Sequence, residues 1–89
     1  MILTKTIKVK NALGLHIRPA AAIVKLLQNT KSSVHFTYKT DTINAKSIMS
    51  ILMLAAKKNS SIKITVDGID AKEILDKLVD GFNVGFGEK

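Results

Sequence analysis

A histidine and an arginine lie two residues apart in the stretch 14–22, close to a glycine and a proline. Pro19 suits the first turn of a helix, because its missing N–H would have no partner there and its fixed φ is already helical. Gly14 can adopt the positive φ that a sharp turn from strand to helix often requires. His16 is therefore predicted at or next to the N-cap of a helix.

That position suits a reaction of the His16 ring with phosphate. The free N–H groups and the positive end of the helix dipole disfavour the imidazolium form, which leaves a neutral nucleophile. The same groups bind anions, and Arg18 adds donors that match phosphate oxygens. The first hypothesis is a histidine that accepts a phosphoryl group. An ordinary N-cap histidine remains the alternative on these residues alone.

Ser47 precedes a second predicted helix and is a typical N-cap residue. The apolar side chains of that helix form two stripes, one of Ile51, Leu54 and Ala55 and the other of Ile48, Met49 and Leu52. A small two-layer fold buries only one such stripe well, so the second is predicted to be an exposed surface that docks partners. Burial of both stripes is the alternative.

We expect no metal and no cofactor. His35 alternates with Val34 and Phe36 on a predicted strand and is interpreted as an ordinary side chain. A pair of His16 and His35 lacks further ligands of suitable type and spacing for a metal. The chain has no cysteine, which excludes disulfides and thiolate zinc sites and is typical of a reducing cytoplasm.

Composition narrows the functional class. The 89 residues and 46% hydrophobic content predict one small domain, 1–89, with a buried core. The net charge of +7 comes from lysines spread along the chain, which suits acidic partners and is unlike a nucleic-acid-binding tract. RNA binding is further disfavoured by an aromatic content of only 4%. The longest apolar run, 48–56, is too short to cross a bilayer, so we expect a cytoplasmic protein without membrane insertion.

Alternating hydrophobicity predicts four strands. They cover residues 3–9, 34–38, 42–44 and 61–66. The two middle strands form a hairpin with a turn around Thr40 and Asp41. The outward positions of the strands are polar and include Lys8, His35, Thr37, Lys63 and Thr65. One face of the sheet is therefore expected to stay in contact with water.

Helical spacing predicts three helices, at 19–28, at 48–56 and after Asp70. Asn59, which tolerates the left-handed conformation, is expected to close the second helix. Asp70 and Glu73 have the spacing of a capping box for the last helix. The buried stripe of that helix is Ala71, Ile74, Leu75, Leu78 and Phe82. The order βαββαβα predicts an α+β, open-faced two-layer sandwich, with a four-stranded, mostly antiparallel sheet and three helices on one face.

Two stretches resemble a known family. They are 14–20, which reads GLHIRPA, and 44–51, which reads NAKSIMSI. Both resemble HPr, the histidine-containing phosphocarrier of the bacterial phosphoenolpyruvate-dependent sugar phosphotransferase system. The resemblance runs along the whole chain and includes 62–66, 67–71 and 86–88. It implies the same open-faced fold.

The resemblance also implies a function. His16 would take a phosphoryl group on Nδ1 from enzyme I and pass it to an enzyme IIA domain, and Arg18 would steady the phosphate. Ser47 matches the serine that HPr kinase/phosphorylase modifies in some lineages. The second apolar stripe, Ile48, Met49 and Leu52, is then the expected docking surface for these partners, and Ile17 beside His16 is expected to add to it. The protein is then a monomeric carrier within a relay and not a stand-alone catalyst.

Some positions depart from the family pattern. Ile17 stands where many members have alanine or threonine, and Asn59 replaces a common glycine. The hairpin turn lacks the glycine usual near Lys39 and Thr40. The lead-in 11–14 also occurs in the nitrogen-related branch of the family. The alternative is therefore a regulatory paralogue, of nitrogen or kinase-signalling type, that binds partners according to its phosphorylation state without serving sugar uptake.

Overall fold

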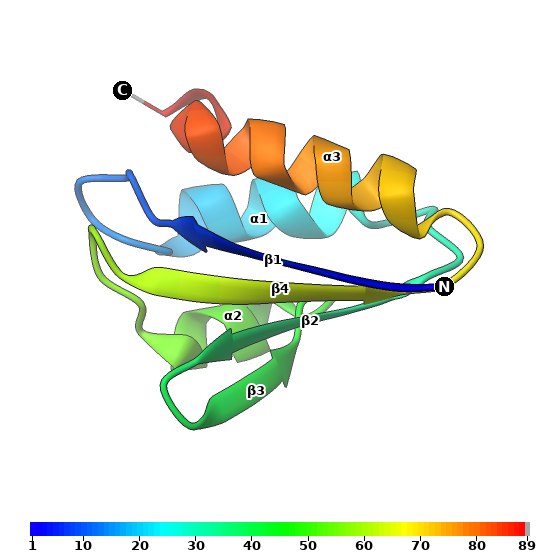
Figure 1. Cartoon of the computed structure of the whole chain (residues 1–89). Coiled ribbons are helices and arrows are strands. Elements are labelled where there is room, and N and C mark those ends of the chain that lie inside the picture. Colours follow the sequence, from blue (N-terminus) through cyan, green and yellow to red (C-terminus); the bar gives the residue numbers. More distant parts are fainter. Residues whose placement is uncertain (89) are drawn as a thin grey trace.

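The computed structural model describes residues 1–88, whose main elements follow in the order βαββαβα (Figure 1). The strands are β1 (Ile2–Lys8), β2 (Ser33–Tyr38), β3 (Asp41–Asn44) and β4 (Ser61–Asp67). The helices are α1 (Ile17–Leu26), α2 (Ile48–Leu54) and α3 (Ala71–Asn83), and a 3-10 turn, η1 (Gly85–Gly87), follows α3. The predicted α+β class and element order are confirmed.

The sheet has the strand order β1-β4-β2-β3, and each pair of neighbouring strands is antiparallel. In this register Ile64 of β4 lies opposite Phe36 of β2, which lies opposite Ile43 of β3. A slip of one residue would turn these apolar side chains to solvent, so burial of one face sets the register. The five polar positions predicted to face outward are exposed or half-buried, which confirms an open face of the sheet.

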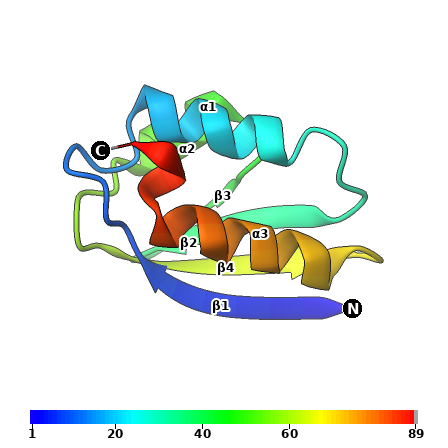
Figure 2. The same cartoon turned by 90° about the horizontal axis from the view of Figure 1, so that it is seen from above.

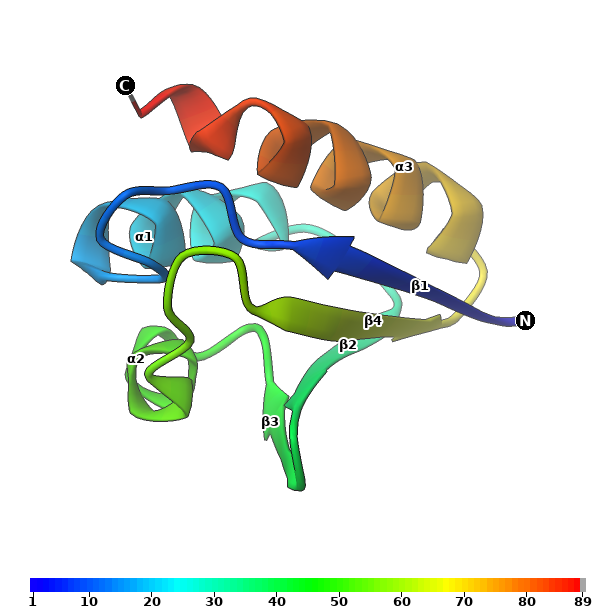
Figure 3. The same ribbon diagram turned by 60° about the vertical axis from the view of Figure 1, so that its left-hand side comes forward.

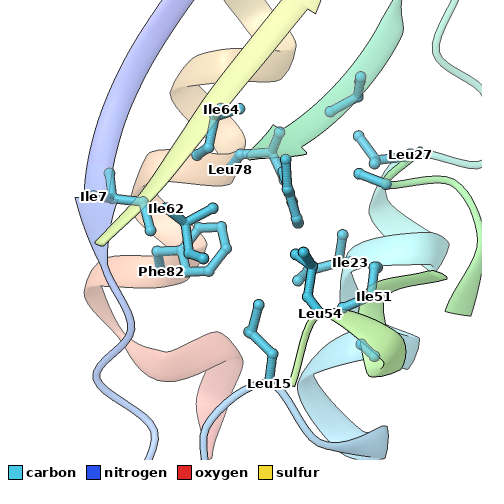
Figure 4. Close-up of a cluster of buried hydrophobic side chains, with 14 of the residues drawn as sticks. Ile7, Leu15, Ile23, Leu27, Ile51, Leu54, Ile62, Ile64, Leu78 and Phe82 are labelled. Atoms are coloured by element: carbon cyan, nitrogen blue, oxygen red, sulfur yellow. The ribbon is translucent and has the colours of Figure 1, made fainter. Parts of the chain in front are cut away.

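The helices form the second layer. Figures 2 and 3 show α1 and α3 side by side over the sheet, with α2 next to α1 and near β3. Isoleucine, leucine and phenylalanine side chains from both layers fill the space between them (Figure 4). The Phe36 ring meets the Phe82 ring of α3 edge to face at a centroid distance of 5.7 Å. This core holds α1, and with it the start of α1, in a fixed position over the sheet.

The limits of two helices differ from the prediction. α1 begins at Ile17, so Pro19 is its third residue. α2 ends at Leu54, and Ala55 follows in the left-handed conformation with φ of 52°. Ala55 is therefore exposed and not part of the buried stripe. Asn59 is also left-handed, with φ of 71°, but it shapes the turn before β4 and does not close α2.

The capping box predicted for α3 is wrong, although Asp70 does occupy the N-cap. The Asp70 carboxylate makes no capping bond and instead accepts hydrogen bonds from the loop after α1. Its donors are the hydroxyl of Thr30 at 2.8 Å, the N–H of Lys31 at 3.0 Å and the hydroxyl of Ser32. Ser32 is fully buried, so its hydroxyl needs this partner. These bonds, with that from Ser32 foremost, lower the pKa of Asp70 to about 2.

Asp70→Asn is expected to lower the melting temperature near neutral pH and to have no effect in strong acid. The folded-state pKa of about 2 lies below the ordinary value of 3.8, so the carboxylate stabilises the fold above about pH 4. That stabilisation is lost as the pH falls from about 4 to about 2. Thermal denaturation across this range checks the prediction, with Asp76→Asn as a control because Asp76 forms an exposed pair with Lys72. A deficit that stayed the same at every pH would contradict it.

Candidate functional site

His16 is the N-cap residue of α1, with φ of −81° and ψ of −170°. This confirms the position predicted from the sequence. The His16 side chain makes no capping hydrogen bond. It is 25% exposed. The imidazole is therefore not occupied by capping α1 and remains available for chemistry.

The turn before α1 depends on Gly14, which has a φ of 69°. A Cβ on this residue would overlap the carbonyl oxygen of Ala56 and lie 3.0 Å from Cα of Lys57. The adjacent N–H of Leu15 donates to the same Ala56 carbonyl at 3.0 Å. The loop that carries His16 is thus pinned to the segment after α2, and only glycine fits the contact.

The open end of α1 has features that favour an anion. The first helical hydrogen bond runs from the N–H of Ala20 to the carbonyl of His16 at 3.1 Å. The N–H groups of Ile17 and Arg18 lie in the first turn, so they have no partners within the helix, and Pro19 has no N–H to satisfy. The exposed Arg18 also lines an open hollow of about 440 Å³, together with Ala12, Leu13, Gly87 and Glu88. Helix dipole, N–H groups and guanidinium all favour an anion here.

Glu88 is a site residue that the sequence reasoning missed. Its Oε2 lies 2.6 Å from Nε2 of His16, and its Oε1 accepts a hydrogen bond of 2.7 Å from Nδ2 of Asn11. The pKa of Glu88 is lowered, first by the bond from Asn11 and next by His16, so the carboxylate stays ionised. No local spacing could have signalled this contact, because Asn11 and Glu88 come from opposite ends of the chain.

The two nitrogens of the His16 ring have different surroundings. Nε2 is sealed from solvent beside Glu88, and the carboxylate approaches it without the linear geometry of a full hydrogen bond. Of the two ring nitrogens, Nε2 is therefore the one whose surroundings are occupied by Glu88.

The predicted docking residues are exposed to different degrees. Ile17 and Met49 are 62% and 67% exposed, whereas Ile48 and Leu52 are half-buried against the core. The first stripe of α2, apart from Ala55, is buried. Among the other exposed apolar residues, Leu13 lines the hollow with Arg18 and Met53 lies on α2, and sequence reasoning named neither. The position of Met53, four residues after Met49, is the signal that places it on the same face of α2.

Ser47 is confirmed as the N-cap of α2, and its hydroxyl accepts a hydrogen bond of 3.2 Å from the N–H of Ser50.

His35 lies on β2 opposite Thr65 and Asn44 and is half-buried. Residues 1–88 contain no cluster of three or more histidine, cysteine or acidic side chains able to hold a metal ion. Over the same residues, no helix combines the length and apolar character needed to cross a membrane.

This chain is similar to known proteins along almost its whole length. The family model described as the phosphorylation site of the PTS HPr component matches residues 3–83. A phosphocarrier protein HPr from Chlamydia pneumoniae is 52% identical and covers 97% of this chain and 80% of its own. A phosphocarrier protein NPr from Klebsiella oxytoca is 34% identical over 99% of each.

Structural similarity agrees with these relatives. The crystal structure of HPr from Thermoanaerobacter tengcongensis superposes with a TM-score of 0.93 at 36% identity and covers 98% of both chains. This chain belongs to the HPr family, the phosphocarrier proteins of the phosphotransferase system.

Proposed function

We propose that this protein carries a phosphoryl group on Nδ1 of His16, which it receives from enzyme I and passes to enzyme IIA domains. The observation that carries the proposal is the His16 ring at the start of α1, which makes no capping hydrogen bond and contacts Glu88 through Nε2 and not Nδ1, with Arg18 two residues away. A neutral imidazole there attacks phosphorus in line, and the N–H groups and Arg18 hold the product. The site is shallow, which suits a carrier, because tight binding of the product would slow onward transfer.

Charge and apolar surface support protein partners for this carrier. The net charge of +7 favours fast encounters with acidic surfaces. Ile17 and Met49 are exposed, and Ile48 and Leu52 lie half-buried on α2, which packs against α1. We infer that these four residues form the docking surface for enzyme I and enzyme IIA, with the protein acting as a monomer. Ser47, at the start of α2, is then the regulatory site for a kinase.

The direct test is incubation of the protein with enzyme I and labelled phosphoenolpyruvate. We expect a label that is lost in acid and stable in alkali, as a phosphohistidine is, and that moves to an enzyme IIA domain when one is added. Absence of label on this chain, with enzyme I itself labelled, would overturn the proposal.

A regulatory role in a nitrogen-related branch is the second candidate. Similarity to NPr over nearly the whole chain favours it, although the identity to HPr of Chlamydia pneumoniae is higher. Both roles use the same chemistry at His16. Rates of transfer to a sugar-type and to a nitrogen-type enzyme IIA, measured side by side, distinguish them, and we expect the sugar-type acceptor to be faster.

Met49→Lys is expected to raise the KM for transfer from enzyme I about tenfold, the scale of a central interface contact. The melting temperature should change little, because the Met49 side chain is 67% exposed. Steady-state phosphotransfer and thermal denaturation provide the two measurements. Ile69→Lys is the matched control, because Ile69 is 88% exposed and lies in the connection between β4 and α3. Unfolding of the Met49 variant, or an equal KM in both variants, would remove Met49 from the docking surface.

A further inference from the structure

The chain after α3 folds back and is anchored on that helix. The ring of Phe86 packs edge to face on Phe82 at a centroid distance of 4.9 Å. Gly81 makes room for it, because a Cβ there would lie 2.8 Å from Cδ1 of Phe86. The backbone reverses through Gly85, Phe86 and Gly87, with φ of 61°, 52° and 78°. Figure 2 shows the resulting turn (red) beside the loop that precedes α1 (blue).

Asn11 ties this C-terminal segment to the loop that carries His16. The Asn11 side chain is almost completely buried, with 4% of the residue exposed. Its Nδ2 donates to the carbonyl of Gly85 at 2.9 Å and to Oε1 of Glu88 at 2.7 Å. Both partners are acceptors, so only the NH₂ group of the amide can face them, and the orientation of the side chain is unambiguous. Asn11 therefore sets the position of the Glu88 carboxylate.

Glu88 in turn covers one nitrogen of the histidine. Its Oε2 lies 2.6 Å from Nε2 of His16, and the Glu88 side chain itself is only 18% exposed. A carboxylate at this distance favours a proton on Nε2 and leaves the lone pair on Nδ1. It also bars an anionic phosphoryl donor from Nε2, by its charge and by occupying the space.

We propose that Glu88, held in place by Asn11, is a positioning residue that directs phosphorylation of His16 to Nδ1 by occupying Nε2. The inference rests on the proposed function of His16 as phosphoryl acceptor and adds which residues decide the nitrogen that reacts. Neither Asn11 nor Glu88 touches the reacting phosphorus; both act through the imidazole ring.

Phosphorylation of Nδ1 in this arrangement requires no proton transfer. The Nδ1 lone pair forms the N–P bond, the bond from phosphorus to the donor breaks, and its electron pair leaves with the donor. Nε2 keeps its proton throughout, so the ring of the product is positively charged. The Glu88 carboxylate compensates that ring charge, while its repulsion of the nearby phosphate favours release to the next acceptor.

The test uses the whole protein and a small chemical donor, phosphoramidate, so that no partner protein is involved. Phosphorus NMR distinguishes histidine phosphorylated on Nδ1 from histidine phosphorylated on Nε2. We expect wild type to form the Nδ1 product, and Glu88→Ala to form a mixture in which the Nε2 product is readily detected. Carboxylates that orient metal-binding histidines contribute about 10- to 100-fold, and by analogy we expect a loss of about tenfold in the rate at Nδ1.

Two further variants separate positioning from packing. Glu88→Gln keeps an acceptor over Nε2 and should retain the Nδ1 product at a reduced rate. Asn11→Asp removes the donor that holds Glu88 and should give the same mixture as Glu88→Ala. Glu73→Ala is the matched control, because Glu73 is an exposed carboxylate of α3 that pairs with Lys77. Should the Asn11 variant not fold, the two Glu88 variants decide the question.

The outcomes are distinguishable from failure of the proposed function. If wild type accepts no phosphoryl group on His16 from phosphoramidate or from enzyme I, the carrier function itself is wrong. If wild type forms the Nδ1 product and Glu88→Ala forms the same product alone at the same rate, the carrier function stands and the role of Glu88 is overturned.

Discussion

His16→Ala should lose all detectable phosphoryl acceptance from enzyme I and still fold. Loss of the nucleophile removes the only atom proposed to bond phosphorus, and in enzymes such a loss costs on the order of 10⁶ in rate. The fold should survive, because the His16 ring is partly exposed and makes no capping bond to α1. Labelling by enzyme I and phosphoenolpyruvate, together with circular dichroism, measures both halves of the prediction.

Arg18→Ala gives the graded comparison. Charge-assisted hydrogen bonds contribute about 1.5–3 kcal/mol, so the rate should fall about 10- to 150-fold without reaching zero. The N–H groups at the start of α1 remain to hold the phosphoryl group. His35→Ala is the control, because it removes the other histidine, which lies on β2, and should label like wild type. Labelling of His16→Ala at the wild-type rate would show that another residue is the acceptor.

The fold could be predicted from short-range patterns wherever one face of an element is buried. Ile62, Ile64 and Val66 alternate with polar residues and are all fully buried in β4. The end of α2 could not be predicted in this way. The helix ends where Ala55 becomes left-handed, and the next carbonyl, that of Ala56, accepts from Leu15, which lies in another part of the chain.

Asp70 shows the same limit for side chains. Its spacing to Glu73 fits a capping box, yet the buried hydroxyl of Ser32 competes for the carboxylate. Long-range contacts of this kind leave no local trace in the sequence.

The candidate site also contains residues that local sequence patterns predict and residues that only long-range contacts bring together. His16, Arg18, Gly14 and Pro19 lie within six consecutive positions, so turn and helix chemistry predicts their arrangement. Glu88 reaches His16 only because Phe86 packs on α3 and Asn11 holds the end of the chain. Sequence reasoning therefore indicated the proposed nucleophile and its anion site, and missed the residues that surround the second ring nitrogen.

Phosphorylation of Ser47 should block transfer from enzyme I to His16 without unfolding the protein. A phosphoserine adds about −1.5 to −2 charges at pH 7, and a negative charge is favourable at the start of a helix. Ser47 caps α2 by accepting from Ser50, so the modified residue stays at the positive end of the helix. The melting temperature should be unchanged or slightly higher.

Docking should suffer because the same charge lies next to the proposed docking surface. Ile48 and Met49 follow Ser47 directly, and a partner suited to a protein of net charge +7 presents an acidic face. The acidic face of the partner then repels the phosphate, and burying the phosphate against an apolar contact costs its hydration free energy. Such juxtaposition costs several kcal/mol, so we expect a fall in rate of at least about 100-fold for the phosphoserine form.

Ser47→Asp and Ser47→Ala separate charge from capping. Aspartate carries about half the charge of phosphoserine and still caps α2, so its rate should fall about tenfold and recover in part at high salt. Alanine should transfer at the wild-type rate while losing about 1 kcal/mol of stability with the cap. The measurement is the rate of His16 phosphorylation by enzyme I for the three proteins at low and high salt. Equal rates throughout would reduce Ser47 to its role as the N-cap of α2.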